Sequence, residues 1–210
     1  MLSIRDVADK TESLSDELRE SRRMNRNFVR GGVDRVYDVV IPELKGRKSH
    51  RKRIEVDILG YTLYSVYHRL RGWHNSGILK NMTLNLHTLS CEFIKSNPAL
   101  NNDWAKQAED NIQTIIAFKD EFKDELSKNK TQINLFSYDH LPAVHGFRIG
   151  NGTLMMSFAK WRKGQIDDPG ETEFEIIHSA QRTKRAQAMQ KVFDNWIEAA
   201  QSYTPKTKKR

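Results

Sequence analysis

The chain has 210 residues, of which 38% are hydrophobic and 30% charged, with a net charge of +8 at pH 7. This length fits one domain with an appendage, and the charge favours anionic partners without choosing among nucleic acid, anionic lipid and acidic protein. The single cysteine excludes an internal disulfide and a multi-cysteine metal site. Apolar runs are shorter than the ~18 residues of a membrane span, and the first residues lack the apolar core of a signal peptide. We therefore expect a cytoplasmic protein.

Residues 2–27 contain neither proline nor glycine and are predicted to form a helix. Seam positions spaced three and four apart give this helix a short heptad pattern: Ile4, Val7, Thr11, Leu14 and Leu18. Such a seam is too short to hold a dimer alone. Residues 1–30 are thus predicted to be a helical arm, which either docks on its own domain or pairs with a second copy or a partner protein.

Residues 31–202 are predicted to form one domain in which strands alternate with helices. Apolar spacing predicts these elements, in chain order: a helix over 33–44, a strand over 54–59, a helix around 63–70, a strand over 82–89, a helix over 103–127, a strand over 133–136, a hairpin turning at 151–152, a strand over 174–177 and a helix over 180–201. This order predicts a mixed α+β sandwich of the α/β class, with helices on the sheet faces. Residues 203–210 have the composition of a disordered basic tail.

Two basic clusters lie on either side of the first helix of this domain. Their predicted contacts with nucleic acid are Arg22, Arg23, Arg26, Arg47, Lys48, Arg51, Lys52 and Arg53. The run over residues 45–53 contains no acid, so it is a candidate for phosphate contacts that weaken with salt. The alternative is a solvated loop without a partner.

The stretch over residues 140–161 is predicted to be an antiparallel hairpin, because Asn151-Gly152 is a strong signal for a two-residue turn. Side chains alternate between the two faces of a strand. His145 therefore shares a face with Phe147 and points toward the core, whereas Arg148 points to the opposite face.

From about Gly31 to Trp196 the chain resembles the phospholipase D-like superfamily. The resemblance is carried by the stretches IEVDILGYTL, MTLNLHTLS, INLFSYDHLPAVHGFRIGNGTLMMSFAKW and VFDNW. It implies a phospholipase D-like central sheet flanked by helices. In catalytic members the hairpin carries His-x-Lys-x4-Asp, where the histidine attacks phosphorus and the lysine holds the phosphate.

This sequence departs from that motif. His145 occupies the place of the histidine, but Phe147 stands at the place of the lysine and Gly152 at that of the aspartate. Arg148 cannot replace the lysine without a bulge, because it points to the other face. One half of the usual two-half arrangement is present, so even a complete pseudo-site needs a dimer.

The closer resemblance is to non-catalytic phospholipase D-like domains of bacterial proteins, which are presumed regulators or sensors. The matching positions are Tyr138, Leu141, Pro142, Gly146, Arg148, Ile149 and Trp161. The resemblance implies a degenerate pocket that binds a phosphate-bearing ligand, either nucleic acid or a nucleotide. The candidate ligand-binding residues are Tyr138, His140, His145, Arg148, Lys160 and Trp161. We expect neither a cofactor nor a metal ion.

Three functions follow from the sequence. The first is a non-catalytic binding or regulatory module, with a bacterial defence or mobile-element complex as one setting. The second is a metal-independent phosphodiesterase or nuclease that acts through His145 in a dimer. The third is a structural assembly subunit that docks through its N-terminal helix.

Overall fold

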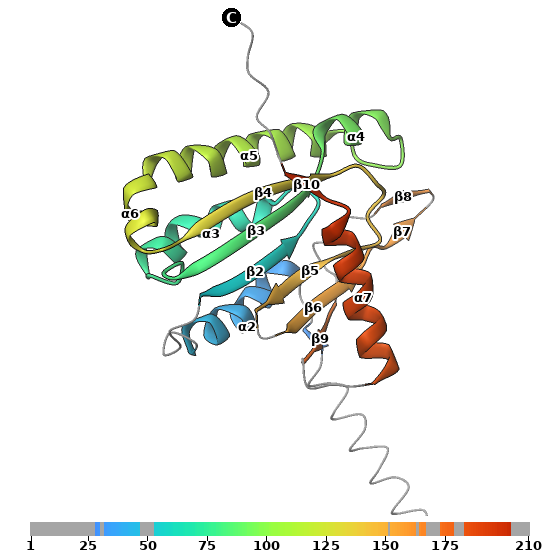
Figure 1. The fold of residues 1–210 in the computed structure, drawn as a ribbon. Helices are drawn as coiled ribbons and strands as arrows, with labels where there is room; N and C mark the ends of the chain where they lie inside the picture. Colours follow the sequence, from blue (N-terminus) through green and yellow to red (C-terminus); the bar gives the residue numbers. More distant parts are fainter. Residues whose placement is uncertain are drawn as a thin grey trace, which may run out of the picture.

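A computed structural model describes residues 28–29, 32–46, 53–150, 152–162, 164–166, 173–178 and 183–202. Residues 1–27 of the helical arm predicted over 1–30, the basic residues 47–52 and the tail over 203–210 lie outside this part of the chain. Near the end of the predicted arm, Phe28 and Val29 form a strand and not a helix. Figure 1 shows the described part as a twisted sheet with helices on both faces. The predicted mixed α/β sandwich is therefore confirmed.

Within the residues that the structure describes, eight strands form the main sheet, in the order β1-β9-β6-β5-β2-β3-β4-β10. In chain order they are β1 (Phe28–Val29), β2 (Ile54–Leu59), β3 (Met82–Leu89), β4 (Gln132–Tyr138), β5 (Val144–Ile149), β6 (Thr153–Phe158), β9 (Phe174–Ile177) and β10 (Gln201–Ser202). The pairs β2–β3 and β3–β4 are parallel, and β5 lies antiparallel to β2. The parallel and antiparallel parts of the sheet thus meet at β2. Two further strands, β7 (Trp161–Arg162) and β8 (Gln165–Ile166), pair only with each other in the described residues.

The helices that the structure describes are α2 (Gly32–Gly46), α3 (Tyr64–Asn75), α4 (Cys91–Ser96), α5 (Asp103–Glu121), α6 (Lys123–Lys128) and α7 (Lys184–Glu198). One core layer packs α2, α3 and the second half of α5 on the sheet face that carries Val56, Ile58 and Phe147. On the opposite face, α7 buries Met189 and Phe193 against Leu154 and Met156. Figure 1 shows α7 crossing β5 and β6 on that face. Both faces of β6 are therefore in a core.

Two helical features differ from the sequence prediction. The helix predicted over 103–127 is interrupted at Phe122, where α5 ends and α6 begins. The Phe122 ring packs at this break against Phe118 and His74, with ring centroids 5.0 and 4.4 Å away. Helix α4 was not predicted; its N-cap is Ser90, whose hydroxyl accepts a hydrogen bond from the Phe93 amide at 3.2 Å.

Candidate functional site

A pocket of about 560 Å³ lies at the carboxyl end of β2 and the beginning of α3. Its walls come from the start of α2, β2, the loop over 60–63, α3, the first half of α5 and the start of β5. The polar and aromatic side chains that line it are Asp34, Tyr61, Thr62, Tyr64, Ser65, His68, Arg69, Trp104, Gln107, His145 and Phe147. In open α/β sheets, ligands bind outside the carboxyl ends of the strands, so this place suits a ligand site.

The loop over residues 60–62 is held in place by three side chains from three different elements. Its successive carbonyl oxygens accept hydrogen bonds from Tyr138 Oη at 3.0 Å, Thr88 Oγ1 at 2.8 Å and Asn111 Nδ2 at 2.8 Å. All three donor residues are buried. The pocket wall is therefore fixed before any ligand arrives, which reduces the entropic cost of binding.

The backbone at Leu63 adopts a conformation that leucine seldom takes. This residue is the N-cap of α3, with φ 58° and ψ 18°, and no side chain caps the helix there. A non-glycine residue in the left-handed region costs about 1–3 kcal/mol and tends to occur at ligand sites. The strained turn lies directly at the pocket, next to the first residues of α3.

His145 lies at the floor of the pocket and is only 4% exposed. Its Nδ1 is 3.3 Å from the Tyr61 hydroxyl, and its ring meets those of Tyr61 and Phe174 at 5.3 and 5.0 Å between centroids. Burial lowers the pKa of His145 to about 4. The imidazole is therefore neutral at neutral pH, and it offers a ligand a polar ring without a positive charge.

The mouth of the pocket carries an ion pair between Arg69 and Asp34. Arg69 Nη2 lies 2.7 Å from Asp34 Oδ1, and Nη1 donates to the Ser65 carbonyl oxygen at 2.8 Å. The guanidinium also stacks 4.2 Å from the centre of the Tyr37 ring. Arg69 is thus fixed in orientation, and its partner Asp34, with a side chain 75% exposed, is free to exchange with an anionic ligand.

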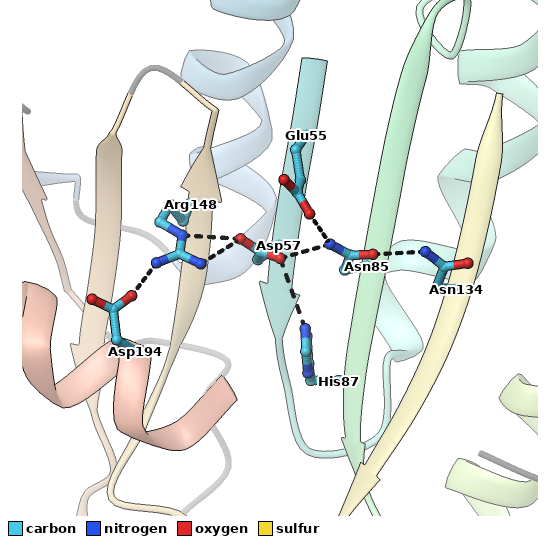
Figure 2. A network of polar contacts seen from close by, with 7 residues as sticks. All are labelled: Glu55, Asp57, Asn85, His87, Asn134, Arg148 and Asp194. Atoms are coloured by element: carbon cyan, nitrogen blue, oxygen red, sulfur yellow. Dashed lines mark hydrogen bonds and ion pairs between the residues drawn. The ribbon is translucent and has the colours of Figure 1, made fainter. Parts of the chain in front are cut away.

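The opposite face of the sheet carries a second polar arrangement, which Figure 2 shows. Arg148, Asp57, Asn85 and Asn134 are direct neighbours across β5, β2, β3 and β4. Asn85 Nδ2 donates to Asp57 Oδ1 at 2.9 Å, and Asn134 Nδ2 donates to Asn85 Oδ1 at 2.9 Å. We call these four residues the polar row.

Arg148 connects the polar row to α7. Its Nε and Nη2 each lie 2.9 Å from Asp57 Oδ2, and its Nη1 donates to Asp194 of α7. Burial disfavours the Asp57 carboxylate, but the nearby His87 ring, the Asn85 amide and the Arg148 charge outweigh it and lower the pKa of Asp57. His87 Nε2 is 3.9 Å from Asp57 Oδ1, beyond hydrogen-bonding distance. The ion pair is therefore set by Arg148, and it fastens α7 to the sheet.

The six predicted ligand-binding residues do not gather in one place. His145 lines the pocket, but Arg148 lies on the opposite face of the sheet, as its strand position predicts. Arg148 therefore does not share the pocket with His145, and its guanidinium forms ion pairs with Asp57 and Asp194.

Three of the other predicted residues, Tyr138, His140 and Lys160, are not among the residues that line the pocket. Tyr138 is 1% exposed and supports the pocket loop from behind through its bond to Gly60. His140 packs on Trp196 of α7, with ring centroids 4.1 Å apart. Lys160 is exposed, and of Trp161 the structure describes the backbone in β7.

Of the predicted nucleic-acid contacts, the structure describes only Arg53. Its Nη2 donates to the Lys130 carbonyl oxygen at 3.2 Å. The other seven, Arg22, Arg23, Arg26, Arg47, Lys48, Arg51 and Lys52, lie outside the described residues. The prediction for these basic residues therefore stays a prediction.

Sequence reasoning missed most of the pocket. Tyr61, Ser65 and Arg69 follow Gly60 at the end of a buried strand, a position where ligand-binding loops occur. That position is the available signal in the sequence, and the local pattern itself indicates only a strand that passes into a helix. Trp104 and Gln107 carry no local signal, because α5 brings them to the pocket from about forty residues away in the chain.

The buried His145 makes the stability of the fold depend on pH. Its pKa is about 4 in the folded protein, against about 6.5 in the unfolded chain. The unfolded chain therefore binds the proton first, and stability present above pH 6.5 is lost as the pH falls toward 4. The full loss is on the order of 3 kcal/mol.

We expect urea unfolding followed between pH 7 and 4.5 to show this loss in the wild-type protein, and a smaller one in His145→Gln. Asp57 also makes stability depend on pH, but at lower pH. Because its pKa in the folded protein is lowered, its contribution to stability is lost only below the usual aspartate pKa of 3.8. Equal slopes for both proteins between pH 6.5 and 4.5 would show that His145 is not buried in its neutral form.

Comparisons with protein-family models, with curated proteins and with solved structures found no match. Among the residues that the structure describes, every helix is too short or too polar to traverse a membrane. Within the same residues, no group of three His, Cys, Asp or Glu side chains is placed to hold a metal ion.

Proposed function

We propose that this chain is a non-catalytic phospholipase D-like module whose pocket binds a phosphate-bearing ligand, either a nucleotide or one nucleotide of a nucleic acid. The observation that carries the proposal is the pocket at the end of β2, with its loop fixed by three buried side chains. Its volume of about 560 Å³ lies within the range of small-ligand sites, about 300–1,000 Å³.

The lining of the pocket fits the two parts of a nucleotide. Tyr61, Trp104 and the neutral His145 offer flat rings to a base, and Tyr61 and Trp104 already lie 5.3 Å apart between ring centroids. Arg69 and the beginning of α3 offer a positive charge and helix amides to the phosphate.

The degenerate motif supports binding without turnover. Phe147, at the place of the phosphate-holding lysine, is 3% exposed and packs between the rings of Tyr37 and Phe174. Lysine does not occur among the described residues that line the pocket. Covalent phosphoryl transfer needs a nucleophile and a phosphate clamp within reach of each other, and His145 has no such lysine beside it.

Two substitutions at the pocket mouth are expected to change affinity in opposite directions. Asp34→Asn frees Arg69 from its ion pair and should strengthen the binding of nucleoside 5′-monophosphates about threefold, the value of an exposed ion pair. Arg69→Gln removes the charge and should weaken binding about tenfold or more. Titration calorimetry with the four common nucleoside 5′-monophosphates measures both effects.

The corresponding nucleosides, which lack the phosphate, are the control. Their affinity should be the same for the wild-type protein, Asp34→Asn and Arg69→Gln. If monophosphates bind no more tightly than nucleosides, or if Arg69→Gln binds them as well as the wild-type protein does, the pocket does not recognise phosphate.

One observation favours a second function, that of a phosphodiesterase. A neutral imidazole at the floor of a pocket is in the protonation state of a nucleophile, and His145 is such a group. If the protein hydrolyses a generic phosphodiester or DNA, and His145→Ala abolishes this activity while monophosphate binding persists, the chain is an enzyme and not only a binding module.

A further inference from the structure

The first turn of α3 carries a cluster of aromatic rings at the mouth of the pocket. Tyr64 is the first residue of the helix, and it lines the pocket together with His68. Positions three and four residues apart share one face of a helix, so Tyr64, Tyr67 and His68 lie together. Ring centroids are 5.8 Å apart for Tyr64 and Tyr67 and 4.7 Å for Tyr64 and His68.

Tyr64 is exposed although its neighbours in the cluster hold it in place. Tyr64 is 51% exposed, and its ring contacts the rings of Tyr67 and His68 edge-to-face, with interplanar angles of 77° and 80°. His68 in turn packs on Tyr67, with centroids 3.8 Å apart. The Tyr64 ring is therefore large, held by its neighbours, open to solvent and next to a pocket. Such a ring offers a surface on which a ligand ring can stack.

We propose that Tyr64 is a base-stacking platform, and that the ligand of the pocket is a single-stranded nucleic acid and not a free mononucleotide. This inference rests on the proposed function of the pocket. One nucleotide enters the pocket, the phosphate that links it to the next lies at Arg69, and the next base stacks on Tyr64. Flat bases stack on exposed aromatic side chains in a way that tolerates any sequence.

The chemistry around Tyr64 favours this occupant over an apolar peptide. Arg69, five residues further along the same helix, places a guanidinium at the pocket mouth, and His68 adds a polar ring beside Tyr64. The chain as a whole has a net charge of +8, which attracts a polyanion. A duplex keeps its bases stacked on each other, so it cannot use the platform.

The test compares mononucleotides with short single strands. We expect a trinucleotide, as DNA or as RNA, to bind the wild-type protein about tenfold more tightly than a nucleoside 5′-monophosphate. Tyr64→Ala should lower trinucleotide affinity about tenfold more than monophosphate affinity, so that this gain is lost, whereas Tyr64→Phe should keep it. Titration calorimetry measures each affinity, and comparison of the DNA and RNA trinucleotides shows which strand is preferred.

Phe158 supplies a matched control. It is 52% exposed, at the end of β6, and it does not line the pocket. Phe158→Ala should therefore leave trinucleotide affinity unchanged. A twelve-base-pair duplex should bind at least tenfold more weakly than either of its strands and should be insensitive to Tyr64→Ala.

The outcomes separate the platform from the pocket. If monophosphates bind but Tyr64→Ala changes trinucleotide affinity by less than twofold, the stacking role of Tyr64 is wrong, while the proposed function of the pocket is supported. If monophosphates do not bind while trinucleotide binding depends on Tyr64, the stacking role of Tyr64 is supported and the proposed function of the pocket is wrong. A duplex that binds as tightly as a single strand, with the same dependence on Tyr64, overturns the assignment to single strands.

Discussion

Replacing Arg148 by methionine is expected to lower the free energy of unfolding by about 3 kcal/mol, because it leaves a buried carboxylate without its cation. Asp57 is 5% exposed, and Arg148 provides it with two nitrogens at 2.9 Å. The same substitution releases Asp194, and with it one of the polar contacts between α7 and the sheet. Urea unfolding followed by circular dichroism measures the loss.

Arg185 provides the control for this substitution. It also bonds a carboxylate through two nitrogens, those to Glu175 at 3.1 and 2.7 Å, but its side chain is 70% exposed. Arg185→Met should therefore change stability by less than about 1 kcal/mol. A loss of similar size for both variants would mean that burial of Asp57 does not set the strength of its ion pair.

Replacing Gly146 by alanine is expected to destabilise the fold by about 3 kcal/mol, because the new methyl group has no space. A Cβ at this position would lie 2.2 Å from the Met155 carbonyl oxygen and 2.9 Å from Met156 Cα. Both are backbone atoms of β6, so the hairpin strands must separate to admit it. His145, the preceding residue, would then lose its place at the pocket floor.

Gly72 is the matched control for this substitution. It lies on the exposed side of α3, and a Cβ there would meet no atom within 4 Å. Gly72→Ala should stabilise the protein by about 1 kcal/mol through the higher helix propensity of alanine. Thermal and urea unfolding of both variants should therefore show shifts of opposite sign. A neutral Gly146→Ala would show that β5 and β6 are further apart than the structure places them.

The elements of this fold were predictable because their sequence patterns are local. The alternation in 54–59 and 82–89 identified β2 and β3, and the Asn-Gly pair identified the hairpin of β5 and β6. Strand parity also placed His145 and Arg148 on opposite faces. Parity could not show that both faces of β6 are buried, since this depends on α7, whose residues lie some thirty positions further along the chain.

The pocket and the polar row were not predictable, because each is formed by residues from separate segments of the chain. Tyr61, Trp104 and His145 meet only because the sheet order brings β5 beside β2 and α5 over the end of both. Asp57, Asn85 and Arg148 each look like a polar residue on the solvent face of a strand. They become neighbours only in the observed register, which no short stretch of sequence determines.

A titration of the uniformly ¹⁵N-labelled protein with a nucleoside 5′-monophosphate, followed by amide NMR shifts, tests most directly whether this pocket holds a phosphate-bearing ligand. The largest shift changes are expected over residues 60–69, in the loop and the first turns of α3, and at His145 and Gly146. Shift changes concentrated at the polar row, around Asn85 and Asn134, or no change at millimolar ligand, would contradict a ligand site at the end of β2.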